Sequence, residues 1–249
     1  MSLVELDLSG HIAVVQLNDP DRRNALTTEM VAELSATFDA IQAARGVRAV
    51  VLRAAGPAFC AGADRRRLAE AAAGADDAKQ ILGAVYEGFL RVARCPLPTI
   101  AAVDGPAVGA GMNLALACDL RLGGPDALFD PRFVQLGLHP GGGHTWLLQR
   151  LVSTQSAAAA VLFGQALDAK AAWRCGLIFE IVASDALEDR ARELAGRAAE
   201  GDRDLLERVK ATMAETRTLG SLDAAVAREF DDQIWSITRA DVADRLGGG

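Results

Sequence analysis

The amino-acid sequence predicts a layered or spiral α/β domain followed by an α-helical C-terminal region. Segments with strand-like and helix-like periodicity alternate from residue 3 to about residue 182, and after Asp185 only helical periodicity remains. No low-complexity linker interrupts the chain. We therefore expect a core at residues 1–195 and a helical region at residues 196–249.

The first elements are predicted to be two strands and a helix. Residues 3–8 and 11–17 alternate as strands do, and residues 9–10 (Ser-Gly) between them favour a turn, so we expect a hairpin. From Thr27 the hydrophobic period becomes helical. The apolar stripe of this helix consists of Met30, Leu34, Phe38 and Ile41.

The alternation of strands and helices then recurs less regularly, which is typical of a layered or spiral arrangement of repeated units. Further strands are expected at residues 48–53, 98–103, 119–122, 127–129 and 178–182, and helices at about 64–93, at 111–117 and after 185. The terminal glycines at 247–249 are expected to be disordered.

Composition excludes several classes of partner. A chain of 249 residues that is 51% hydrophobic is long enough to bury a sizeable core. Its formal net charge of -7 argues against nucleic acid or an anionic membrane as a partner, because both favour a basic surface. Glu5 and Asp7 interrupt the N-terminal segment, so no signal peptide is expected, and no stretch is apolar enough to span a bilayer.

The four cysteines indicate neither a disulfide framework nor a metal site. Cys60, Cys95, Cys118 and Cys175 are widely spread, without the paired spacing of zinc ligands. A reducing cytoplasm is therefore the expected location, and no metal is expected. We expect the cysteines to be small buried residues.

Two segments of small residues each lie between a predicted strand and a predicted helix. They are residues 59–64 (Phe-Cys-Ala-Gly-Ala-Asp) and residues 104–111 (Asp-Gly-Pro-Ala-Val-Gly-Ala-Gly). Such junctions leave backbone N–H groups unpaired, and small residues let a ligand approach the backbone closely. A Gly-rich turn alone is more often just a turn, but two such junctions that converge on one oxygen would stabilise negative charge there.

The order and spacing of these segments resemble the two oxyanion-hole segments of the crotonase (enoyl-CoA hydratase/isomerase) superfamily. Three further segments are similar to that family: residues 23–26 (Arg-Asn-Ala-Leu), 117–121 (Ala-Cys-Asp-Leu-Arg) and 136–143 (Leu-Gly-Leu-His-Pro-Gly-Gly-Gly). Together they cover most of residues 3–182 in the expected order. The resemblance implies a crotonase-like spiral of repeated β-β-α units with a C-terminal trimerisation region, in a homotrimer or hexamer.

The same resemblance implies an acyl-CoA thioester as the ligand. The N–H groups of Ala61 and Ala110 would hold the thioester oxygen while an enolate develops. Coenzyme A is then part of the substrate, so no separate cofactor is implied. The implied contacts to the CoA portion come from Arg23, Ala25, Ala61, Gly62, Ala63 and Asp64.

Several residues of the first segment have two interpretations. Arg65, Arg66 and Arg67 stand in a first helical turn, where cations are unfavourable, and fit either a CoA phosphate or a solvated or intersubunit face. Asp64 fits either a helix N-cap or a ligand contact. Cys60 has no basic neighbour and therefore fits a packing residue better than a nucleophile.

The sequence departs from the family where its hydratases place two glutamates around a water. Asn113 stands at the first position and Phe133 at the second. An amide can position water but cannot act as a base, and a phenyl ring can do neither. His139, His144 and Asp130 are the alternative acid/base candidates, although each also fits a structural role in a loop, a helix start or a turn.

Three functions remain open at this point. The favoured one is an enoyl-CoA hydratase/isomerase-like enzyme that uses the oxyanion hole but lacks both usual glutamates. The second is another reaction of the superfamily, such as acyl-CoA hydrolysis, using His139, His144 or Asp130. The third is a non-catalytic acyl-CoA binding protein that has kept the oxyanion hole and lost the carboxylates.

Overall fold

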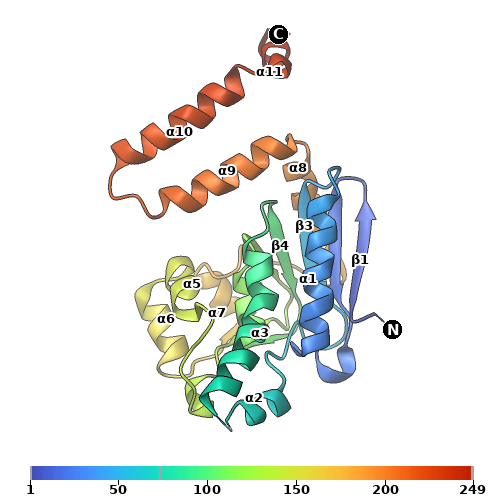
Figure 1. Cartoon of the computed structure of the whole chain (residues 1–249), viewed down its shortest axis with the longest axis vertical. Helices are drawn as coiled ribbons and strands as arrows, with labels where there is room; N and C mark the ends of the chain where they lie inside the picture. The colour runs from blue at the N-terminus through green and yellow to red at the C-terminus, as the bar shows by residue number, and fades with distance from the viewer. Residues whose placement is uncertain (1, 73, 248–249) are drawn as a thin grey trace.

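The computed structural model describes residues 2–72 and 74–247 (Figure 1). Within them the larger sheet has the order β1-β2-β3-β4-β6-β9 and the smaller one the order β5-β7-β8. The larger sheet consists of β1 (Val4–Ser9), β2 (Ile12–Leu17), β3 (Ala49–Ala54), β4 (Thr99–Val103), β6 (Leu120–Gly123) and β9 (Glu180–Ile181). The smaller sheet consists of β5 (Pro106–Val108), β7 (Leu128–Asp130) and β8 (Leu167–Asp168).

Strands β1 and β2 form the predicted hairpin. They pair antiparallel from Val4 opposite Leu17 to Ser9 opposite Ile12. From β2 onwards the neighbouring strands of the larger sheet are parallel, with helices in the crossovers. Parallel strands of this kind are buried on both faces, which explains the continuous apolar runs in the sequence. The predicted α/β class is confirmed.

Helices cover both faces of the larger sheet. Figure 1 shows α1 (Thr28–Ala43) and α3 (Ala75–Ala93) side by side on one face, and α1 buries the stripe predicted from the sequence. On the opposite face, α8 (Leu187–Ala199) packs with buried small side chains against the sheet. This second cluster contains Val14, Ala49, Val51, Ile100, Ala102, Leu122, Leu187, Ala191 and Ala195.

Two local predictions are corrected. The helical segment expected at about 64–93 is divided into two helices, α2 (Arg65–Ala71) and α3, and Gly74 in an extended conformation precedes the second. The segment expected to be only a Gly-rich loop contains β5, which pairs in parallel with β7. A three-residue strand is too short to show a period of two in sequence.

The remaining helices complete the chain. They are α4 (Ala110–Leu116), α5 (His144–Leu151), α6 (Thr154–Val161) and α7 (Ala169–Arg174), with short 3-10 helices at Pro20–Arg22, Val134–Leu136 and Ser184–Ala186. None of the helices in the described ranges is long and apolar enough to cross a membrane.

The C-terminal region is helical, as predicted. Figure 1 shows α9 (Arg203–Thr216), α10 (Leu222–Ile237) and α11 (Ala240–Gly247) extending away from the sheets. The expected division after residue 195 falls inside α8, whose buried face continues to Ala199. Of the terminal glycines expected to be disordered, Gly247 ends α11, and residues 248–249 lie outside the described residues.

Candidate active site

The two small-residue segments lie side by side. Cys60 and Ala107 form a parallel bridge, in which the Cys60 N–H donates to the Pro106 carbonyl oxygen at 3.1 Å and the Val108 N–H donates to the Cys60 carbonyl oxygen at 2.9 Å. The two predicted junctions are therefore neighbours in the fold.

Gly62 makes the close approach possible. Its φ of +90° favours glycine, and a Cβ there would lie 2.5 Å from the Val108 carbonyl oxygen and 3.4 Å from the Ala110 nitrogen. Gly111 has a similar role on the other segment, because a Cβ at this position would lie 2.1 Å from the Cys60 carbonyl oxygen. The two segments are thus in direct backbone contact.

We expect Gly111→Ala to lower the free energy of unfolding by about 1–3 kcal/mol, because the added methyl must push apart two backbone segments. Gly83→Ala is the matched control. Gly83 lies exposed inside α3, where an added Cβ meets no other heavy atom. The free energy of unfolding of this variant should therefore rise by about 0.5–1 kcal/mol. Urea denaturation measures both changes, and equal signs for the two variants would contradict the contact.

One predicted donor is wrong. The N–H of Ala61 donates to the carbonyl oxygen of Arg23 at 2.9 Å, so it is not free for a ligand. Among the described residues, the N–H groups of Ala63 and Ala110 have no protein acceptor, and both residues line the same cavity. Ala63 therefore replaces Ala61 as the candidate donor, while Ala110 is retained.

Asn24 stabilises the loop that contains Arg23, whose carbonyl oxygen accepts from the Ala61 N–H. Its amide is buried, its Oδ1 accepts from the Asp19 N–H at 2.8 Å, and its Nδ2 donates to the carbonyl oxygens of Ala55 and Ala58, both at 2.9 Å. Its φ of +54° is a conformation that asparagine tolerates better than most residues. This structural role was not predicted, although an asparagine inside a family-like segment was a signal for it.

The cavity beside the two donors has a volume of about 890 Å³, which is within the usual range for small-molecule sites. Its wall is mainly apolar. The apolar part includes Leu68, Leu82, Val85, Tyr86, Val108, Phe133, Leu136 and Leu138, and the polar part includes Arg23, Arg65, Asn113, Arg132 and His139. No carboxylate side chain is among the lining residues in the described parts of the chain.

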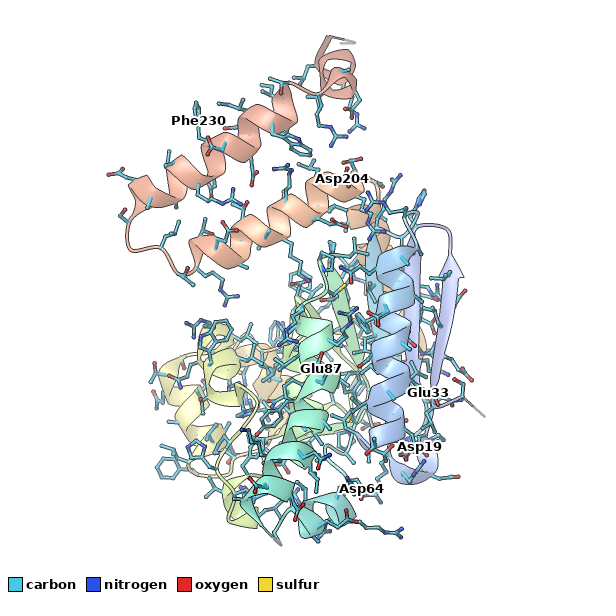
Figure 2. All side chains as sticks on the ribbon, viewed as in Figure 1. Asp19, Glu33, Asp64, Glu87, Asp204 and Phe230 are labelled. Atoms are coloured by element: carbon cyan, nitrogen blue, oxygen red, sulfur yellow. The ribbon has the colours of Figure 1, made fainter. Side chains whose placement is uncertain are left out.

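The predicted CoA contacts divide into two groups. Arg23, Gly62 and Ala63 line the cavity together with Ala61, whereas Ala25 and Asp64 do not. The Asp64 carboxylate caps α2 by accepting from the Arg66 N–H at 2.9 Å, and Figure 2 shows Asp64 at the start of that helix. For Asp64, the capping interpretation is therefore the one that the structure supports.

The three arginines at positions 65–67 differ in their surroundings. Arg65 lines the cavity, whereas Arg67 pairs with Glu70 on its own helix. All three arginines are exposed, so the solvated-face interpretation holds for at least part of the run.

Asn113 is bonded on both sides of its amide. Its Nδ2 donates to the Gly141 carbonyl oxygen at 3.0 Å, and its Oδ1 lies 2.7 Å from Nδ1 of His144. His144 is buried, and the ring of Phe133 packs against it with centroids 5.1 Å apart. Asn113 and Phe133, the positions at which the resemblance implies glutamates in hydratases, therefore both contact His144.

Burial lowers the pKa of His144 to about 4, so its ring is neutral at pH 7. The unfolded chain, with an ordinary histidine pKa near 6.5, binds more protons between about pH 4 and 6.5. The free energy of unfolding should therefore fall as the pH drops through this window, by at most ~1.4 kcal/mol per pH unit from this group. Urea denaturation at several pH values should show this component in the wild type, while a His144→Phe variant with the same pH dependence would contradict it.

Asp130 is buried but does not line the cavity. Its carboxylate accepts from Nε of Arg132 at 2.8 Å and from the Nη2 of the same side chain, and its carbonyl oxygen accepts from the Gly109 N–H at 2.8 Å. These contacts argue against the predicted role in proton transfer, because the carboxylate is bonded to Arg132 and does not face the cavity. Asp130 instead holds Arg132 at the cavity wall.

His139 lies exposed at the cavity wall. Its Nδ1 donates to the carbonyl oxygen of Pro140 at 2.7 Å, which leaves Nε2 as the unprotonated nitrogen of the neutral ring. Of the predicted acid/base candidates, His139 alone lines the cavity within the described residues.

The enoyl-CoA hydratase/isomerase family model matches residues 7–242 of the chain. The chain belongs to this family. A probable enoyl-CoA hydratase of Mycobacterium tuberculosis is 49% identical over 248 residues, covering 98% of this chain and 95% of the relative. The 1,2-epoxyphenylacetyl-CoA isomerase of Escherichia coli is 35% identical over 186 residues, covering 74% of this chain and 71% of the relative.

Solved structures agree with this assignment. An enoyl-CoA hydratase from Bacillus anthracis superposes with a TM-score of 0.92 at 27% identity, covering 98% of this chain and 95% of the other. An enoyl-CoA hydratase from Mycobacterium smegmatis gives a TM-score of 0.90 at 27% identity, with the same coverage. The predictions of a crotonase-like fold and of an enzyme from the enoyl-CoA hydratase/isomerase family are confirmed.

Cys60 is a packing residue in this family member. It is fully buried, and burial raises the pKa of its thiol to about 12, so the thiol stays protonated at neutral pH. All four cysteines are free. The interpretation of Cys60 as a packing residue rather than a nucleophile is confirmed.

Tyr86 is a cavity residue that was not predicted. It comes from α3, and a Cβ on Gly141 would lie 2.1 Å from its hydroxyl oxygen, so the phenol lies against the Gly-rich loop. It is the chain's only tyrosine, and it directly follows Val85 of the buried helix stripe. A single aromatic residue beside an apolar stripe was too weak a signal to indicate a site.

Proposed function

We propose that this chain binds acyl-CoA thioesters and holds the thioester oxygen on the backbone N–H groups of Ala63 and Ala110. The observation that supports this is the direct contact of their two segments, with both N–H groups lacking a protein acceptor among the described residues and both residues on the cavity wall. Fixed donors in a dry site stabilise the charge of an enolate without reorganising during the reaction.

The CoA portion is proposed to lie across the mouth of the same cavity. Arg23 and Arg65 are exposed side chains on its wall, next to the small residues Gly62 and Ala63. Arginine binds phosphate through several donors, and the small residues let the ligand approach the backbone. Coenzyme A enters as part of the substrate, and no separate cofactor is proposed.

The reaction that this site supports best is proton transfer at a thioester enolate, with His139 as the single acid/base. Hydration by two glutamates has no support, because the described cavity wall contains no carboxylate. An isomerisation needs one group that removes a proton from one carbon and returns it to another, which a single imidazole can do. The similarity to an epoxyphenylacetyl-CoA isomerase is in line with this choice.

The second candidate function is acyl-CoA binding without turnover, which the missing carboxylates favour. A panel of enoyl-, 3-enoyl- and saturated acyl-CoA esters separates the candidates. We expect thermal protection by the esters together with isomerisation of at least one unsaturated ester. Binding without any turnover would leave the non-catalytic function, and failure of every ester to raise the melting temperature would contradict both.

The expected homotrimer or hexamer is also proposed. The C-terminal helices α9 and α10 carry an exposed apolar surface, and Phe230 lies on α10 (Figure 2). Contiguous exposed apolar surfaces often mark protein contacts. The surface consists of Val209, Met213, Leu222, Val226, Phe230, Ile234 and Ile237.

Analytical ultracentrifugation should give three or six times the chain mass of 26.1 kDa. The double variant Val226→Asp and Phe230→Asp should shift the mass toward the monomer, because it places charges in the apolar surface. Glu229→Gln, at an exposed neighbouring position, should keep the wild-type mass. A wild-type mass of one chain would contradict the assembly.

A further inference from the structure

The orientation of the Asn113 amide follows from its two partners. A carbonyl oxygen can only accept a hydrogen bond, so the Asn113 atom 3.0 Å from the Gly141 carbonyl oxygen must be the NH₂ group. The Asn113 oxygen therefore faces His144, whose Nδ1 must carry the hydrogen of their 2.7 Å bond. The histidine thus fixes which end of the amide points where.

The burial of His144 keeps this arrangement in place. Its ring is neutral at pH 7, and with the hydrogen on Nδ1, the buried Nε2 is an acceptor with no partner in the described structure. The reversed amide would place the Asn113 oxygen against the Gly141 carbonyl oxygen, two acceptors at hydrogen-bond distance. Rotation of the amide is therefore unfavourable on both sides.

The NH₂ end lies on the cavity side. Asn113 and Gly141 both line the cavity, whereas His144 does not. One hydrogen of the NH₂ group is used by Gly141, and the other has no acceptor among the described residues. Asn113 consequently offers the ligand a hydrogen-bond donor, the opposite of the acceptor that a glutamate would offer.

Helix geometry relates this donor to the thioester. Ala110 and Asn113 are three residues apart on α4, so they share a face, and the Asn113 side chain leans toward the helix N-terminus. A ligand whose carbonyl oxygen (on C1) lies on the Ala110 N–H can extend its next carbons along the Asn113 side chain. An oxygen on C3, two carbons from the thioester carbon, is then within its reach.

We infer that His144 holds the Asn113 N–H toward the cavity, and that this donor selects acyl-CoA thioesters carrying a carbonyl oxygen at C3. The inference rests on the proposed thioester site. His144 is a positioning residue, because it acts on the ligand only through Asn113.

Calorimetry with two esters of equal chain length tests this selection. Acetoacetyl-CoA has a C3 carbonyl and butyryl-CoA has none. We expect the wild type to bind acetoacetyl-CoA ~3–10-fold more tightly, the effect of one hydrogen bond. Asn113→Leu, which keeps the side-chain size and removes the donor, should bring this ratio close to one.

His144→Phe separates positioning from a merely structural role. It keeps a ring beside Phe133 and removes the donor to Asn113, so the acetoacetyl-CoA preference should fall while the affinity for butyryl-CoA stays the same. If the role of His144 were merely structural, the variant would bind both esters more weakly by the same factor. Circular dichroism verifies the fold. If His144→Phe does not fold, the ratio of the two ester affinities in Asn113→Leu tests the inference.

Two results would overturn the inference while leaving the proposed function intact. One is equal affinity of the wild type for the two esters. The other is an undiminished preference for acetoacetyl-CoA in Asn113→Leu. That result would show that the preference arises from the enol form of acetoacetyl-CoA bound to the two backbone donors. Failure of both esters to bind would instead overturn the proposed function and the inference together.

Discussion

Replacing Ala110 with proline is expected to lower kcat for acyl-CoA turnover by ~10²–10³-fold, the typical effect of losing one oxyanion donor. Proline has no N–H, and Ala110 is the first residue of α4, where the fixed φ of proline fits and the N–H has no intrahelical partner. Gly109 precedes it with a ψ of -116°, outside the helical region that a following proline disfavours. Steady-state kinetics with the most reactive ester of the panel measure the change.

The matched control for this variant is Thr154→Pro. Thr154 is the first residue of α6, exposed and outside the cavity wall, so the same substitution at the same helical position should leave kcat unchanged. Thermal melting of both variants separates loss of a donor from loss of fold. A folded Ala110→Pro protein with wild-type kcat would show that the Ala110 N–H does not bind the thioester oxygen.

His139→Ala is expected to lower kcat by ~10²–10⁴-fold, the usual contribution of a general acid/base. The imidazole lies at the cavity wall with Nδ1 bonded to the Pro140 carbonyl oxygen, which leaves Nε2 to exchange a proton with the substrate. The affinity for a saturated ester should change little, because this ester needs no proton transfer. Comparing kcat with the dissociation constant of butyryl-CoA makes the distinction.

His11→Ala provides a control of the same chemical type. His11 is also exposed, and its Nδ1 also donates to a backbone carbonyl oxygen, that of Gly46 at 2.8 Å, but it lies by the β1–β2 hairpin outside the cavity wall. Loss of this imidazole should leave kcat unchanged. Equal losses in the two variants would show that His139 contributes through stability and not through proton transfer.

Much of the fold could be predicted from the sequence because its signals are local. The apolar stripe of α1 and the alternation of the β1–β2 hairpin each lie within one element and reflect its own period. The two small-residue segments were likewise recognisable as continuous runs. The break between α2 and α3 and the short strand β5 were missed, because neither is long enough to establish a period.

The site was harder to predict, because its hydrogen bonds join residues far apart in the chain. The Ala61 N–H donates to the carbonyl oxygen of Arg23. Nothing in residues 59–64 indicates that an earlier loop folds back to accept this hydrogen bond. His144 and Asn113, 31 residues apart, likewise looked independent. Which N–H stays free depends on every acceptor that the fold brings near it.

By itself, the sequence determined the α/β class, the family resemblance, the two small-residue segments and the residue types at positions 113 and 133, neither of which is glutamate. These depend on residue identity and local period. The tertiary structure decided that Ala63 and not Ala61 has an N–H without a protein acceptor among the described residues, that Arg132 pairs with Asp130, and that the Asn113 amide donates to the Gly141 carbonyl oxygen. The direction of a hydrogen bond depends on where its partner lies in space, and only packing sets that position.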